Sequence, residues 1–302
     1  MISAIDQAGV LGYKVVVFTG GEATLVGSDL TRAIKRANLR GMSTRLVTNA
    51  YWATSLEEAR RRTTSLAEAG LAEINYSTGD QHSRFVPLEN VIRATRAALE
   101  ASLNVSVMVE LVGARKITKA TVEGHPEFQS VVRDFPGKWV NVHESPWMPL
   151  SDLVVSRYPD GVAINRSTLS ATRGCNSVLS TTTVEADGVI GACCGLGMRL
   201  IPELQLGTED TTTLADADRR AADDFLKRWI RVEGPAKILA WAAEIDPEIK
   251  WENMYAHRCQ ACLRLYKDPR VRKVVREHHF QKLADVIFSE WLLYHYTDSA
   301  KV

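Results

Sequence analysis

The feature that most constrains this chain is an alternation of short apolar segments, rich in β-branched residues, with segments of helical periodicity. The alternation continues from the amino terminus to about residue 145. Strands that alternate with helices pair in parallel through right-handed crossovers, so the pattern predicts an α/β fold. Five apolar segments, each bounded by Gly, Asn, Asp or Pro, are the expected buried strands: Lys14–Thr19, Thr44–Thr48, Glu73–Ser77, Asn104–Val112 and Trp139–His143.

The segments between these strands carry apolar residues at helical spacing, within 30–37, 56–66 and 91–103. Ser55 stands three residues before Glu58, a pattern typical of a helix start. Gly41 and Gly70 are placed to end helices. These signals agree with the predicted order of strands and helices.

Polar residues follow the predicted strands at or near their carboxyl ends, at 19–22, Thr48, Asn49, 77–82 and Glu110. In βα barrels the functional site is built at this edge of the sheet. Taken alone, Asn49 and Asp80 are equally well explained as turn residues. Together the residues predict a ligand pocket.

The charge balance excludes some kinds of partner. The 302 residues include 37 Lys and Arg against 36 Asp and Glu, which argues against a nucleic-acid or anionic-membrane partner. No apolar run approaches the ~20 residues of a membrane span, and the amino terminus lacks the pattern of an export signal. We therefore expect a cytoplasmic protein.

Five cysteines stand at Cys175, Cys193, Cys194, Cys259 and Cys262. Structural disulfides are rare in the cytoplasm, so metal ligation is the leading interpretation. Cys259 and Cys262 form a CxxC motif, CQAC, which is also the pattern of a redox pair. A thioredoxin-like pair requires the motif at a helix start after a strand in a βαβ unit, and CQAC is not so placed. A structural zinc site has the same ligands and stays an alternative.

Four segments carry a resemblance to a known family: FTGGEATL, LVTNA, INYSTGDQHSRFVPLENVIRATRAAL and VSVMVELV, in this order and spacing. The sequence resembles radical S-adenosylmethionine (radical SAM) enzymes over nearly the whole chain. The resemblance implies a partial (β/α) TIM-like barrel that lacks its first strand, at residues 1–150. A small α/β auxiliary-cluster domain of the twitch or SPASM kind, with carboxyl-terminal helices, is expected at residues 151–302.

The resemblance also implies roles for residues at the predicted sheet edge. Gly20, Gly21 and Glu22 would bind the amino group of S-adenosylmethionine, because an ammonium needs acceptors. Ser77 would hold the ribose or carboxylate, while Val109 and Glu110 would lie beside the adenosine, and Asn49 completes the expected cofactor site. His82 is a candidate to contact substrate or act as acid or base; local hydrogen bonding in a turn is the alternative.

In the second half, the sequence CNSVLSTTTVEADGVIGACC predicts two short strands around a turn at 186–188. A hairpin with cysteines and a distant CxxC resembles the twitch domain, which implies a second [4Fe-4S] cluster bound by Cys175, Cys193, Cys259 and Cys262. Cys194 is the surplus thiol, and an exchange of roles with its neighbour stays open.

The sequence departs from the family in one respect, since it contains no CxxxCxxC loop ahead of the glycines. Either that segment lies upstream of Met1, which we prefer, or the barrel is degenerate. The first interpretation predicts an enzyme that cleaves S-adenosylmethionine to a 5′-deoxyadenosyl radical. It would take an external electron donor and a small-molecule or peptide substrate. The second predicts a non-catalytic iron–sulfur or zinc protein. Without the loop, S-adenosylmethionine is expected to bind weakly.

Overall fold

The computed structural model describes residues 1–148 and 158–299. The chain divides into two compact units, Met1–Trp147 and Met148–Val302. Each unit is described by itself below.

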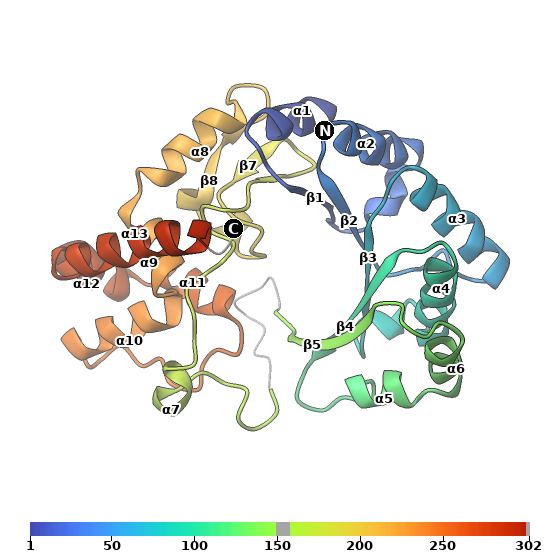
Figure 1. Ribbon diagram of the computed structural model, residues 1–302. Helices are drawn as coiled ribbons and strands as arrows, with labels where there is room; N and C mark the ends of the chain where they lie inside the picture. The colour runs from blue at the N-terminus through green and yellow to red at the C-terminus, as the bar shows by residue number, and fades with distance from the viewer. Residues whose placement is uncertain (149–157, 300–302) are drawn as a thin grey trace. The chain divides into compact units, whose positions relative to one another are not determined.

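The first unit is built on a five-stranded parallel sheet in the order β1-β2-β3-β4-β5 (Figure 1). All five strands predicted from the sequence are present, so the α/β class with a parallel sheet is confirmed. The registers pair Phe18 with Leu46 and Leu46 with Ile74, which sets the apolar residues of neighbouring strands side by side. The strands are β1 (Val15–Phe18), β2 (Ser43–Thr48), β3 (Glu73–Thr78), β4 (Asn104–Leu111) and β5 (Val140–Pro146).

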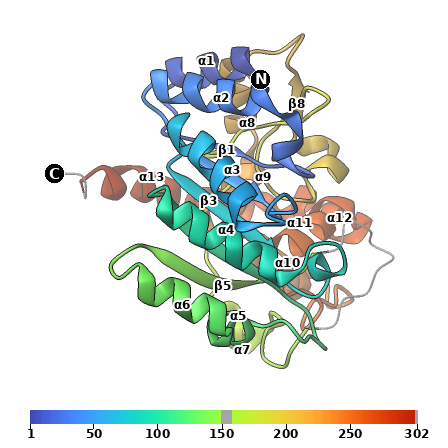
Figure 2. The same ribbon diagram turned by 90° about the vertical axis from the view of Figure 1, so that its right-hand side faces the viewer.

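Helices line one face of this sheet, as Figures 1 and 2 show for α2, α3 and α4. The core of the unit lies between them, where fully buried Leu46, Ile74 and Val107 pack with Ile34 and Ile92. The helices are α1 (Ile2–Val10), α2 (Ser28–Leu39), α3 (Leu56–Glu68), α4 (Leu88–Glu100), α5 (Lys119–Gly124) and α6 (Pro126–Asp134), with short 3₁₀ turns η1 (Ala23–Val26) and η2 (His82–Arg84).

The predicted helix ends are also confirmed. The Ser55 hydroxyl accepts a hydrogen bond from the Glu58 amide at the start of α3. Gly41 and Gly70 follow α2 and α3 with φ of 75° and 96°, a conformation that residues with a side chain rarely adopt.

Side chains alternate across a strand, and the opposite face of the sheet is polar on β3 and β5 and mixed on the other strands, where it includes Val15, Val17, Val47 and Met108. Asn75 pairs with Ser106, which in turn pairs with Asn141 on β5. The Ser106 hydroxyl lies 3.2 Å from Nδ1 of His143. A five-stranded parallel sheet with helices along one face is compatible with part of a (β/α) barrel.

The second unit combines a three-stranded antiparallel sheet, in the order β6-β7-β8, with helices. The predicted hairpin is confirmed, and its turn ends at Gly188 with a φ of 83°. The elements are α7 (Arg166–Leu169), β6 (Thr183–Val184), β7 (Val189–Gly191), η3 (Met198–Leu200), η4 (Pro202–Leu204), β8 (Gln205–Thr208), α8 (Leu214–Ala222), α9 (Phe225–Val232), α10 (Pro235–Ile245), α11 (Arg258–Lys267), α12 (Pro269–His278), η5 (His279–Lys282) and α13 (Leu283–Ser299).

In the part of the chain that the structure describes, no helix has both the length and the apolar character needed to cross a membrane.

Candidate functional site

Glu22 connects the ends of the first two strands. It lies after β1 as the N-cap residue of η1, and its Oε1 accepts hydrogen bonds from the amide and hydroxyl of Thr24, at 3.1 and 2.6 Å, and from the Thr48 hydroxyl at 2.8 Å. Its Oε2 accepts a hydrogen bond from the Asn49 amide at 2.9 Å. Each oxygen of an ionised carboxylate offers about two acceptor positions, and Oε2 accepts one of these hydrogen bonds, so it keeps a second position for a ligand.

The other residues predicted around Glu22 differ in what they offer. Gly20 and Gly21 are exposed, and nothing lies within 4 Å of the position a Cβ would take at either, so the backbone is open to a ligand. Asn49 makes a turn of its own, since its Oδ1 accepts from the Tyr51 amide at 2.9 Å. The sequence left open whether Asn49 makes a turn or binds a ligand. The hydrogen bond to Tyr51 is the kind that a turn residue makes.

A second group of polar side chains lies where β3 and β4 end. Glu110, on β4, is 1% exposed, and its carboxylate accepts a hydrogen bond from the Gln81 amide. Its Oε2 lies 2.8 Å from Nδ1 of His82. Because an ionised carboxylate only accepts, a neutral His82 carries its proton on Nδ1 and presents Nε2 as an acceptor. A buried carboxylate that orients an imidazole is an arrangement suited to acid–base chemistry.

The loop that carries His82 is held from both sides. Gly79, with a φ of 131°, lies so close to Glu110 that a Cβ would come within 2.1 Å of its Cγ. Asp80 reaches the loop after β4 and accepts hydrogen bonds from the amides of Lys116 and Ile117, at 2.9 and 2.8 Å. The His82 ring also meets Trp147 edge to face, with centroids 6.1 Å apart. The histidine is therefore fixed in orientation.

Two further predicted residues lie on opposite faces of the sheet. Ser77, half-buried, is on the polar face and pairs with Met108. The Val109 side chain is fully buried in the core under the helices, so only its backbone lies at the sheet edge with Glu110.

In the second unit, the fold brings together three cysteine segments that are far apart in the sequence. Cys175 is held by its amide, which donates to the Ile230 carbonyl at the end of α9. The Sγ atoms of Cys193 and Cys259 lie 3.5 and 3.0 Å from the position that a Cβ on Gly195 would take. A side chain at position 195 would therefore crowd the two sulfurs.

The thiols influence one another electrostatically. Burial, with smaller contributions from the neighbouring cysteines, raises the pKa of Cys193 to about 11 and that of Cys259 to about 12. Burial also raises the pKa of Cys262 well above its ordinary value, with added effects from Cys259, Cys193 and Cys175. These three thiols resist ionisation, and a bound cation would convert them to thiolates together with Cys175.

The adjacent cysteines differ in environment. Cys193 is buried and interacts with Cys262, whereas Cys194 is exposed and lies 3.1 Å from the Ser177 hydroxyl. The buried position favours Cys193 as the ligand of the pair.

Four thiols are a donor set that binds either zinc or an iron–sulfur cluster as thiolates. In 1–148 and 158–299, no three His, Cys, Asp or Glu side chains are gathered closely enough to bind a single metal. A tetrahedral zinc site needs every sulfur about 2.3 Å from one point. A [4Fe-4S] cluster is also bound by four thiolates, which lie on different irons.

The position of the CxxC differs from the prediction in one respect. Cys259 and Cys262 lie in the first turns of α11, so the pair is at a helix start after all. No strand leads into that helix; its N-cap is His257, whose Nδ1 accepts a hydrogen bond from the Cys259 amide at 3.2 Å. Burial lowers the pKa of His257, which keeps the ring neutral and able to accept.

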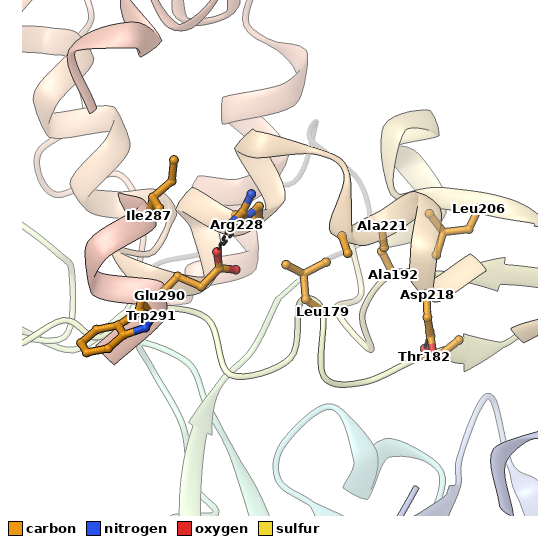
Figure 3. Close-up of a pocket in the computed structure, with 11 residues that line it drawn as sticks. Leu179, Thr182, Ala192, Leu206, Asp218, Ala221, Arg228, Ile287, Glu290 and Trp291 are labelled. Carbon is orange, nitrogen blue, oxygen red and sulfur yellow. Dashed lines mark hydrogen bonds and ion pairs between the residues drawn. The ribbon is translucent and has the colours of Figure 1, made fainter. Parts of the chain in front are cut away.

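A cavity of about 500 Å³ lies in the same unit (Figure 3). Ala192, next to Cys193, is one of its lining residues, and Ile287 and Trp291 of α13 are others. Figure 3 shows that the charged groups at one side, Arg228 and Glu290, bind each other; Arg228 Nε lies 2.7 Å from Glu290. The remaining lining is largely apolar, so the cavity suits a small apolar group.

The sequence identified most of the polar residues at the two sites but not their contacts with one another. The pairing of His82 with Glu110 joins positions that are distant in the sequence, and only the register of β3 against β4 reveals it. Tyr266 was also missed, although its spacing of four residues after Cys262 on a helix was a usable signal.

No family model matches the chain, and no characterised protein matches its sequence. The resemblance to radical SAM enzymes therefore stands on the motifs alone.

Proposed function

We propose that this chain is a radical SAM-type iron–sulfur protein in which Cys175, Cys193, Cys259 and Cys262 bind an auxiliary [4Fe-4S] cluster. The observation that carries the proposal is the convergence of these thiols from three separate segments, with electrostatic coupling among them. Such a cluster, when bound, supplies a site for electron transfer or for anchoring a substrate.

The first unit supports the same proposal. The carboxyl edge of its sheet presents open glycine backbone and the Glu22 carboxylate, which still has an acceptor position. Acceptors of this kind suit the ammonium group of S-adenosylmethionine. His82, oriented by Glu110, is the side chain best placed to exchange a proton with a substrate. The substrate is a small molecule or a peptide, and an external donor supplies the electron.

The test of the cluster is anaerobic reconstitution of the chain with iron and sulfide, followed by iron and sulfide analysis and electron paramagnetic resonance of the reduced protein. We expect one [4Fe-4S] cluster per chain. Cys259→Ala abolishes it, while Cys194→Ala, the matched control at the exposed thiol, leaves it in place. Stoichiometric zinc without iron and sulfide would refute the cluster.

The enzymatic part of the proposal needs a second experiment. An upstream CxxxCxxC segment is fused to the chain, and 5′-deoxyadenosine formation is measured under a strong reductant. We expect S-adenosylmethionine to bind more tightly to the fusion and to be cleaved, and Glu22→Ala to weaken both. A fusion that binds its cluster yet never cleaves S-adenosylmethionine would favour the alternative, a non-catalytic iron–sulfur or zinc protein.

A further inference from the structure

Tyr266 lies one helical turn after Cys262 on α11, so Cys259, Cys262 and Tyr266 follow one stripe of the helix. Its side chain is buried, with 5% of the residue exposed. Among the described residues its hydroxyl oxygen is buried and has no hydrogen-bond partner. A buried hydroxyl without a partner is unfavourable, and such a group in a native protein calls for a ligand or another function.

The groups around this phenol are thiols and carboxylates. Burial raises the pKa of Tyr266 well above its ordinary value, and Cys262, Asp224, Glu203 and Cys193 raise it further, in that order. Tyr266 therefore remains protonated and is available as a donor. Every group in this surrounding set is an acceptor when ionised.

The carboxylates of the set already have cationic partners. Asp224 binds the buried Lys227 at 2.5 Å, and Glu203 lies 3.2 Å from Arg272. Cys193 accepts a hydrogen bond from the Gly195 amide. Cys262 lies one helical turn before Tyr266 on the same stripe of α11, which makes it the acceptor that the phenol can serve.

We propose that Tyr266 donates a hydrogen bond to the Cys262 thiolate once a metal group is bound by the four cysteines. The inference rests on the proposed function, since a neutral thiol is a weak acceptor and a metal-bound thiolate is a good one. Tyr266 then acts as a positioning residue: it fixes the ligand sulfur and stabilises its negative charge. The same hydroxyl destabilises the metal-free protein, where it has no partner, and stabilises the metal-bound protein, where it has one.

The test compares wild type, Tyr266→Phe and Tyr255→Phe, each with and without the reconstituted cluster. Tyr255 is the matched control, because it is a buried tyrosine of the same unit whose hydroxyl already has a partner, Arg264, at 2.7 Å. Neither substitution alters a cysteine. The readouts are the rate at which a chelator removes iron, the reduction potential of the cluster, and the urea midpoint of the metal-free protein.

We expect Tyr266→Phe to lose its iron about 10 to 100 times faster than wild type, the size of effect typical for the loss of such an outer-shell partner. Its reduction potential becomes more negative, because the thiolate charge is no longer stabilised. Without metal the same variant has a higher urea midpoint than wild type. Tyr255→Phe has the wild-type iron release and a lower urea midpoint.

The two proposals fail differently. If wild type assembles the cluster and Tyr266→Phe matches it in iron release and potential, the role of Tyr266 is refuted and the proposed function stands. A lower urea midpoint in metal-free Tyr266→Phe also refutes it, since the hydroxyl would then have a partner in the free protein. If wild type binds no metal group at all, the proposed function and the role of Tyr266 are both refuted.

Discussion

Replacing Glu22 by glutamine tests how the carboxyl edge of the parallel sheet is held together. In the native protein the Glu22 carboxylate accepts four hydrogen bonds, two from Thr24, one from the Thr48 hydroxyl and one from the Asn49 amide. Glutamine keeps the size of the side chain but replaces one oxygen by an NH₂ group, which can only donate. If its oxygen keeps the position with three donors, the NH₂ faces the Asn49 amide.

The magnitude follows from that one contact. Two donors that face each other leave the Asn49 amide without an acceptor, which costs about 1–3 kcal/mol for a buried group. Loss of the negative charge also weakens the three remaining hydrogen bonds, since charge-assisted bonds are the stronger kind. A loss of 1–3 kcal/mol in local opening free energy corresponds to amide exchange about 5 to 150 times faster.

The assay is native-state hydrogen exchange of the Asn49 and Thr24 amides, measured by NMR. Glu68→Gln is the matched control, because Glu68 is an exposed residue near the end of α3. We expect the control to exchange like wild type at both amides and Glu22→Gln to exchange faster, most of all at Asn49. Unchanged exchange at Asn49 in Glu22→Gln would refute this account of the strand ends.

Two further predictions concern the first unit. Gly79→Ala places a Cβ within 2.1 Å of a buried glutamate at a φ of 131°, so we expect urea denaturation to show a loss of at least ~2 kcal/mol in unfolding free energy. Gly137→Ala, with a φ of 81° and nothing within 4 Å, loses about 1 kcal/mol, and equal losses would contradict the clash. Hydrogen bonds from two arginines lower the pKa of Asp6 from 3.8 to about 2. The resulting stabilisation of α1 is present at neutral pH and lost as the pH falls from about 4 through about 2, a dependence that amide exchange in α1 should show for wild type and not for Asp6→Asn.

The order of strands and helices in the first unit could be predicted because its signals are local. Five apolar segments bounded by turn residues became β1 to β5, and Ser55, Gly41 and Gly70 mark helix ends where the sequence placed them. Each of these features depends on residues a few positions apart. The barrel geometry is not local in this sense, and it stays a proposal.

The hydrogen-bond partners within the candidate site could not be predicted, because they depend on which side chains meet in the folded chain. The sequence placed Glu22 and Glu110 at the carboxyl ends of the strands. It did not show that Thr48 and Asn49 donate hydrogen bonds to Glu22. Nor did it show that the His82 ring contacts Glu110. These contacts depend on the register of neighbouring strands. A one-residue shift would turn each side chain to the other face of the sheet.

The cysteines show the same limit for the second unit. Their types and their hairpin were visible in the sequence, whereas the burial that separates Cys193 from Cys194 was not. The approach of Gly195 to two sulfurs depends on contacts between a hairpin and a helix start that lie far apart along the chain. The donor set leaves zinc and a [4Fe-4S] cluster as alternatives, and the choice of the cluster rests on the resemblance of the motifs.

The glutamine substitution at Glu22 also separates a structural role from a ligand-binding one. The acceptor position that the native carboxylate leaves open belongs to Oε2, the same oxygen that faces the Asn49 amide. Glutamine with its NH₂ at this position turns an acceptor for an ammonium into a donor, which repels it. If the chain binds S-adenosylmethionine as proposed, we expect Glu22→Gln to lose that binding, measured by calorimetry, even where the sheet edge stays folded. Faster exchange at Asn49 with unchanged binding would mean that Glu22 only joins the two strands, and that the ammonium site, if the chain has one, is formed by the glycine backbone alone.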